Sequence, residues 1–145
     1  MKKTYAGGCF CGQLTFEFDG PSLWCAHCHC TMCRRSHGAP LVTWVGVDEQ
    51  KFRLNDDSTL RWFASSTDAK RGFCSRCGST VFFTSTRWPG EIHIARAAIP
   101  GDIDRQPQCH AYWESHVDWI SVDDHLERKE SIGPEGPPTK QWQNL

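Results

Sequence analysis

The stretch Cys28-His29-Cys30-Thr31-Met32-Cys33 places three cysteines within six residues, and two cysteine pairs stand far from it in the sequence. These pairs are Cys9-Phe10-Cys11 and Cys74-Ser75-Arg76-Cys77. Tetrahedral zinc with Zn–S bonds of about 2.3 Å needs sulfurs roughly 4 Å apart, and cysteines one or two residues apart reach this spacing where the backbone turns. The spacing therefore predicts that these cysteines are metal ligands.

Glycines flank the two pairs in positions that suit tight metal-binding turns. Gly12 follows the first pair and Gly78 follows the second, and glycine readily adopts the positive φ angles that such turns use. We expect the two pairs to form one closed structural zinc site from Cys9, Cys11, Cys74 and Cys77. Because the pairs are 63 positions apart (74 minus 11), this zinc would join distant parts of the chain and contribute to folding itself.

The cluster formed by Cys28, Cys30 and Cys33 provides three ligands and no obvious fourth. A zinc ion with three protein ligands keeps a position open for a substrate, as catalytic zinc sites do. Two alternatives remain open at this point: a metal-free or redox-active thiol cluster, and a four-ligand site. The side chains that could close the site are Cys25, His27, His29, His37, Cys109 and His110.

The nine cysteines could instead form disulfides, but the start of the chain argues against export. Residues 1–5 (Met-Lys-Lys-Thr-Tyr) lead into glycines and a cysteine without the apolar segment of a signal peptide. We therefore expect a reducing cytoplasm, with zinc preferred over disulfides.

No run approaches the ~20 apolar residues of a membrane span. The formal net charge of −1 indicates neither a nucleic-acid nor an anionic membrane partner, and Lys70-Arg71 is interpreted as solvated surface.

The hydrophobic pattern predicts a mainly β fold. Polar and apolar residues alternate over 13–18, as in a half-buried strand. One short helical turn is predicted over residues 31–36, ahead of Gly38 and Pro40. We expect one zinc-binding domain over residues 1–130 and a tail rich in proline and glycine over residues 131–145, where Trp142 could pack. Further strands, each rich in β-branched or aromatic residues, are predicted at 41–47, 51–54, 59–64, 80–84 and 91–97.

Taken together, these motifs resemble the glutathione-dependent formaldehyde-activating enzyme family over residues 4–127. The resemblance is carried by Gly8-Cys9-Phe10-Cys11-Gly12, by residues 28–35 with Gly38-Ala39-Pro40, by Phe73-Cys74-Ser75-Arg76-Cys77-Gly78, and by the later Cys109-His110 and Trp119. It implies a β-tent-like fold of small antiparallel sheets pinned by zinc, with two zinc ions per chain. The implied structural zinc lies at Cys9, Cys11, Cys74 and Cys77, and the implied catalytic zinc at Cys28, Cys30 and Cys33.

The resemblance also implies a carbon–sulfur lyase reaction that condenses glutathione with formaldehyde to S-hydroxymethylglutathione. Because glutathione carries two carboxylates, Arg34 and Arg35 become candidates for binding this small-molecule thiol. Cys25 and Cys109 lie outside the implied ligand set, and they could serve a redox sensor instead. The competing hypothesis is a non-enzymatic zinc-binding structural or adaptor module, because centromere protein V carries a similar domain.

Overall fold

The structure, a computed structural model, describes residues 2–130 of the chain. One α-helix, α1, covers Thr31–His37 in this part of the chain, and short 3-10 turns cover Glu49–Lys51 (η1), Arg96–Ala98 (η2) and Trp113–Ser115 (η3). The strands are β1 (Thr4–Gly8), β2 (Thr15–Asp19), β3 (Trp24–Cys28), β4 (Val42–Asp48), β5 (Phe52–Asp56), β6 (Leu60–Ala64), β7 (Ala69–Cys74), β8 (Thr80–Ser85), β9 (Glu91–Ala95), β10 (Cys109–Ala111) and β11 (Glu127–Arg128).

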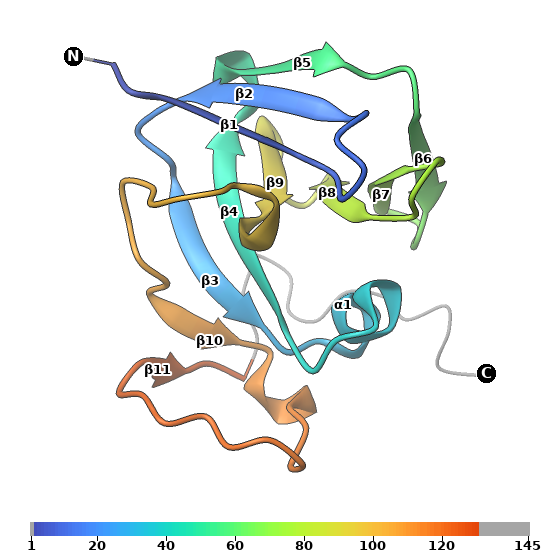
Figure 1. Ribbon diagram of the computed structural model, residues 1–145. Helices are drawn as coiled ribbons and strands as arrows, with labels where there is room; N and C mark the ends of the chain where they lie inside the picture. Colours follow the sequence, from blue (N-terminus) through green and yellow to red (C-terminus); the bar gives the residue numbers. More distant parts are fainter. Residues whose placement is uncertain (1, 131–145) are drawn as a thin grey trace.

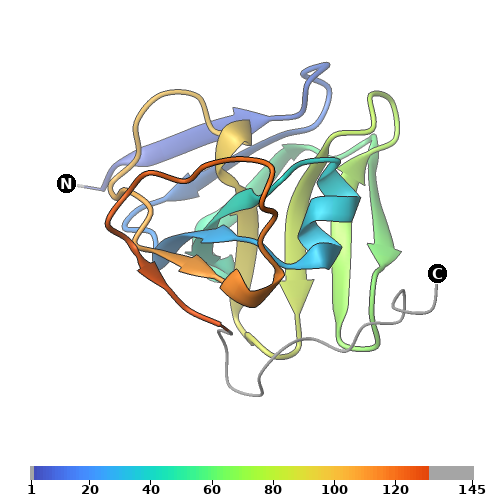
Figure 2. The same ribbon diagram turned by 90° about the horizontal axis from the view of Figure 1, so that it is seen from below.

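These strands form two sheets. A three-stranded sheet has the order β1-β2-β5, and an eight-stranded sheet has the order β11-β10-β3-β4-β9-β8-β7-β6. Neighbouring strands pair antiparallel except at β10, which runs parallel to both β3 and β11. The smaller sheet lies over one end of the larger one, and α1 lies at the opposite end (Figure 1). Seen from below, α1 and the turn η3 share that end of the molecule (Figure 2).

The mainly β fold with one short helix, expected from the sequence, is confirmed. The strands expected from the pattern correspond to β2, β4, β5, β6, β8 and β9. Strands β1, β3, β7, β10 and β11 were not expected. In β3 the burial of Trp-Cys-Ala-His-Cys does not follow a strict alternation, because the strand lies between two paired neighbours. The expected tail over residues 131–145, including Trp142, lies outside the described residues, and the division at residue 130 stays a prediction.

The main core lies between the two sheets. Phe16 and Phe18 alternate with outward-facing polar residues along β2 and are fully buried. They pack against Val45, Val47 and Ile94, which the larger sheet contributes from β4 and β9. Burial of a large apolar side chain stabilises the fold by roughly 1.5–3 kcal/mol, so this contact fixes how the two sheets stack.

Gly7 marks a close contact between β1 and the turn η2. A Cβ atom at this position would clash with the carbonyl oxygen of Ala98 and would lie 2.6 Å from the Phe16 ring. Because a backbone atom cannot move aside cheaply, Gly7→Ala is expected to lower the free energy of unfolding by about 1–3 kcal/mol. Chemical denaturation at a fixed zinc concentration measures this loss. A change within about 0.5 kcal/mol, as for an ordinary surface substitution, would contradict the close contact.

Helix α1 begins and ends on residues that cap it. Cys30 is the N-cap, and its sulfur accepts a hydrogen bond from the backbone N–H of Cys33 at 3.2 Å. Gly38 ends the helix in the left-handed conformation, with φ of 60°. Met32 and Cys33 face inward and are buried. The metal-ligand candidates therefore also define the start of the helix.

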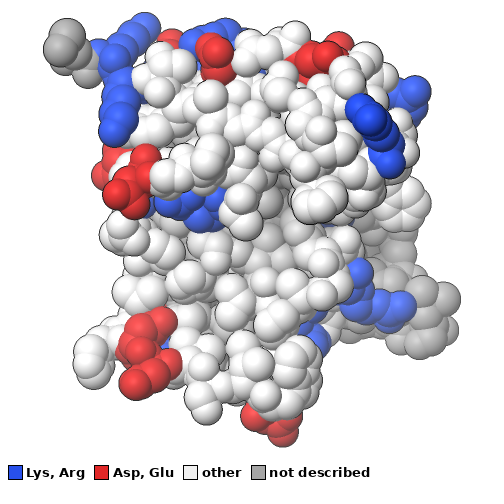
Figure 3. All heavy atoms as spheres, viewed as in Figure 1, with Lys and Arg blue, Asp and Glu red and all other residues white. Residues whose placement is uncertain are grey.

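The surface shows no single sign of charge on the face in Figure 3, where acidic and basic side chains surround a broad uncharged area. Within the described chain, none of the helices has both the length and the apolar character that crossing a membrane requires.

Candidate metal centres and active-site cavity

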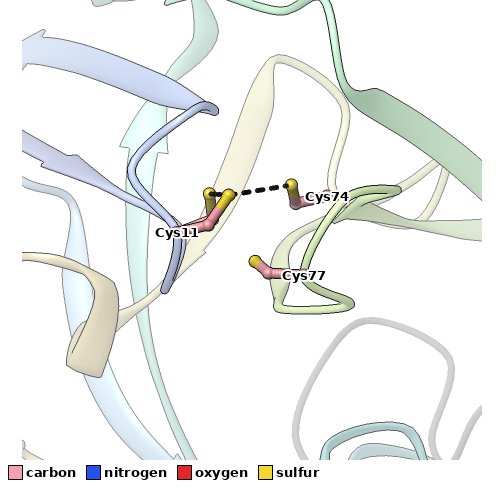
Figure 4. Close-up of side chains that lie close together, drawn as sticks. Cys11, Cys74 and Cys77 are labelled. Atoms are coloured by element: carbon pink, nitrogen blue, oxygen red, sulfur yellow. Dashed lines mark hydrogen bonds between the residues drawn. The ribbon is translucent and has the colours of Figure 1, made fainter.

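The first thiol group joins two loops that are distant in the sequence. Cys9 and Cys11 come from the connection between β1 and β2. Cys74 is the last residue of β7 and Cys77 lies in the turn before β8, and both face Cys11 (Figure 4). Their sulfurs all lie within 4.8 Å of one another, with 3.6 Å between Cys9 and Cys11 and 3.8 Å between Cys11 and Cys74. Tetrahedral zinc needs sulfurs about 4 Å apart, so this four-thiol set fits a closed structural zinc.

The backbone around the first group holds the thiols in position. The glycines that follow each pair, Gly12 and Gly78, have φ of 79° and 80°. The Ser79 hydroxyl lies 3.2 Å from the Cys77 sulfur. Hydrogen bonds from the Ser79 hydroxyl and backbone amide lower the pKa of Cys77 to about 5. A thiol that is readily deprotonated is suited to metal ligation at neutral pH.

The second thiol group consists of Cys28, Cys30 and Cys33, at the junction of β3 and α1. All three are buried, and their sulfurs lie within 4.8 Å of one another. Among the described residues, no fourth histidine, cysteine or carboxylate side chain belongs to this group. The three-thiol set therefore fits a zinc ion with one open position. The structure brings together the three cysteines that the sequence singled out, and their role as ligands stays a prediction.

The extra thiols Cys25 and Cys109 lie apart from this group. Cys25 packs in the main core with Val45 and Val47, whereas the three-thiol group belongs to a second apolar cluster. Burial raises the pKa of Cys25 to about 11 and also raises the pKa of Cys109. Since the thiolate is the reactive form, neither residue has the character of a redox-sensing cysteine.

A cavity of about 290 Å³ opens beside the three thiols. Its walls are mainly aromatic and apolar, and they include side chains from β3, β4, β7, β8, β9 and the segment after β10. The aromatic residues that line it are Trp24, Trp44, Phe83, Trp88 and Tyr112. A largely apolar pocket with a few polar groups next to reactive side chains is the usual form of a small-molecule site.

Arg71 is the polar residue that connects the cavity with the thiols. It is only 4% exposed, and its Nη1 and Nη2 atoms lie 3.6 and 3.7 Å from the Cys33 sulfur. Its guanidinium stacks 5.0 Å from the centre of the Phe83 ring. Hydrogen bonds from Cys28 and Cys30, together with the Arg71 charge, hold the pKa of Cys33 well below its usual value.

The expectation that Lys70-Arg71 forms solvated surface is wrong for Arg71. The two residues are neighbours on β7, so their side chains point to opposite faces: Lys70 is exposed and Arg71 is buried. Arg87, 8% exposed, is a second cation in the cavity wall and stacks 4.9 Å from Trp88. Sequence reasoning missed both arginines, although strand alternation could have indicated Arg71.

The candidates Arg34 and Arg35 lie in the second half of α1. Arg34 is half-buried and Arg35 is exposed, and the cavity lining includes neither of them. Their role toward a substrate carboxylate stays a prediction. The cations that the fold brings beside the three thiols come instead from strand β7 and from the turn after β8.

A chain of hydrogen bonds supports the loop between Cys28 and Cys30. His29 Nε2 lies 2.8 Å from His110 Nδ1, and His110 Nε2 lies 2.9 Å from Asp124. Burial and the neighbouring His110 lower the pKa of His29 to about 4, which keeps its imidazole neutral at physiological pH. His29 therefore faces His110 rather than joining the thiol group, and Asp124 is a site residue that sequence reasoning did not identify. Such partners orient the loop that carries metal ligands.

Comparison with known proteins identifies the family of the chain. The family model described as glutathione-dependent formaldehyde-activating enzyme matches residues 4–115. A Halomonas elongata protein named for glutathione-dependent formaldehyde activation is 27% identical over 125 residues, which cover 81% of this chain and 80% of that protein. An uncharacterised lyase of Schizosaccharomyces pombe is 32% identical over 120 residues, covering 74% of this chain and 85% of that protein.

A solved structure shows the same fold. The crystal structure of a Rhodobacter sphaeroides protein aligns with a TM-score of 0.57 at 24% identity, over 69% of this chain and 92% of that one. The family match over most of the chain confirms the resemblance seen in the sequence: the chain belongs to the glutathione-dependent formaldehyde-activating enzyme family.

Proposed function

We propose that the protein is a zinc-dependent carbon–sulfur lyase that joins a thiol to an aldehyde, with glutathione and formaldehyde as the pair that the family implies. The observation that carries the proposal is the three-thiol group, buried on the wall of a cavity, for which residues 2–130 offer no fourth side-chain ligand. An adaptor module would need neither an open metal position nor a substrate-sized cavity beside it. We place the reaction in a reducing cytoplasm, where glutathione is the abundant thiol.

Two zinc ions per chain are part of the proposal. The group formed by Cys9, Cys11, Cys74 and Cys77 would hold a structural zinc, and Cys28, Cys30 and Cys33 would hold the second. When bound at the three-thiol group, zinc would supply Lewis acidity to the site.

The reaction forms one carbon–sulfur bond. The thiol sulfur attacks the carbonyl carbon, the electron pair of the C=O π bond moves onto oxygen, and the thiol proton ends on that oxygen. Arg71 would stabilise the negative oxygen through its positive charge, because its side chain lines the cavity and its Nη atoms lie beside the Cys33 sulfur. The aromatic walls exclude water, which strengthens this charge interaction.

The test is the exchange of labelled formaldehyde between its hydrate and S-hydroxymethylglutathione, followed by NMR. We expect the zinc-loaded protein to accelerate exchange above the uncatalysed rate. Arg71→Met is expected to lower this acceleration by about 10–100-fold, as loss of a group that supports a metal site does. Lys70→Met is the matched control, since this neighbour points outward over Trp62. An uncatalysed rate with zinc-loaded wild type would refute the lyase assignment.

A further inference from the structure

We propose that the cavity binds an aromatic group on the carbonyl side of the substrate, so that the protein acts on aromatic aldehydes and their glutathione adducts. The inference rests on the proposed function, because it places the reacting carbon beside Cys28, Cys30 and Cys33. The same thiol addition then applies: the sulfur–carbon bond forms, the π electrons move to oxygen, and the thiol proton is transferred to that oxygen.

The size of the cavity exceeds what formaldehyde would fill. Formaldehyde has only two heavy atoms, whereas the cavity measures about 290 Å³, and one water molecule takes only ~30 Å³ of liquid volume. Wall atoms that face empty space lose dispersion contacts. With formaldehyde alone bound, most of the wall would have no ligand atoms in contact with it. A ring-sized substituent would restore those contacts.

The walls have the chemistry of an aromatic binding site. The ring centre of Phe83 lies 5.9 Å from that of Trp44 and 6.1 Å from that of Trp88. His93 stacks on Phe83 at 5.4 Å and continues the same surface. Aromatic rings prefer the offset and edge arrangements that such a curved wall offers to an inserted ring.

The polar groups of the wall are largely engaged with one another. Glu91 accepts hydrogen bonds from Trp24 at 3.2 Å and from His93 at 2.7 Å. Arg71 directs both Nη atoms at the Cys33 sulfur. Arg87 is a second cation in the wall, but the lining is otherwise mainly apolar, so most of the hydrogen bonds of glutathione's carboxylates, ammonium and amides would be lost there. The tripeptide therefore belongs outside the cavity and the carbonyl-derived group inside it.

Stable thioethers of glutathione test the occupant directly. S-benzylglutathione carries a ring on the carbon attached to sulfur, and S-methylglutathione carries the one-carbon group that formaldehyde would supply. In isothermal titration of zinc-loaded protein, we expect S-benzylglutathione to bind at least about tenfold more tightly, because burial of an aromatic ring gives at least that gain. Equal affinity for the two thioethers would overturn the inference.

Variants locate the ring in the cavity. Trp88→Ala removes one wall and is expected to abolish most of the preference, while Trp119→Ala is the control, because Trp119 is 68% exposed and is not part of the lining. Should Trp88→Ala fail to fold, Ala69→Leu fills the cavity from β7 and is expected to reduce the preference as well, with the exposed Ala64→Leu as its control. A preference that survives these cavity variants would overturn the assignment.

The exchange experiment separates this inference from the lyase proposal. Catalysed formaldehyde exchange without a preference for the benzyl thioether would overturn the aromatic assignment and leave the lyase reaction standing. Exchange no faster than the uncatalysed rate would refute the lyase reaction, while the ratio of the two thioether affinities would still decide what the cavity holds.

Discussion

Cys74→Ser is expected to deprive the chain of its structural metal and to give insoluble or metal-depleted protein. Cys74 supplies one of four sulfurs that join the β1–β2 connection to the β7–β8 turn. Structural zinc contributes on the order of 10–16 kcal/mol in small zinc peptides, which equals or exceeds the roughly 5–15 kcal/mol total stability of a domain. Loss of one thiolate therefore removes a contribution as large as the whole stability of the fold.

The measurement is zinc per chain in the soluble fraction, beside the yield of that fraction. Cys109→Ala is the matched control, because Cys109 is also buried but belongs to neither thiol group. This control is expected to stay soluble with two zinc ions. Soluble Cys74→Ser with full zinc content would contradict the assignment of the first group as structural.

Cys30→Ala is expected to release the second zinc and keep the first. The Cys30 sulfur has two roles, since it is one of three candidate ligands and also caps α1 through the backbone N–H of Cys33. Loss of an N-cap costs about 0.5–2 kcal/mol, which the fold should survive, whereas loss of one of three ligands should abolish tight binding.

Cys30→Ser separates the two roles. Serine is a good N-cap residue, so this variant restores the cap without restoring the thiolate. We expect both variants to bind one zinc ion per chain in place of two. Only the alanine variant is expected to lose more free energy of unfolding than the loss of the metal explains. Two zinc ions retained in both variants would mean that Cys30 is not a ligand.

The sequence predicted the two thiol groups well because their information is local. Within each motif the ligands are one to three residues apart, and glycines mark the turns beside the first group. The pairing of Cys9 and Cys11 with Cys74 and Cys77 followed from counting ligands, since four thiols close a zinc site and three do not. The structure brings the same residues together.

The cavity could not be predicted in the same way, because its walls come from strands, a helix and turns that are far apart in the sequence. In the sequence, Arg71 is one of two adjacent cations, Lys70 and Arg71, that are typical of an exposed surface. The pairing of β7 with β8 shows which face of the sheet it occupies. Asp124 reaches His110 across a separation of fourteen residues without regular structure to signal it. Side chains of this kind are identified by topology, not by spacing.

The most direct test of the central claim is titration of glutathione into zinc-loaded wild type and Cys30→Ser protein. The claim is that the three-thiol group holds a zinc ion whose open position receives the thiol. It predicts two zinc ions per chain and glutathione binding in the wild type, with both the second zinc and the binding lost in the variant. Two tightly held zinc ions and no glutathione binding in the wild type would contradict it and would favour a purely structural module.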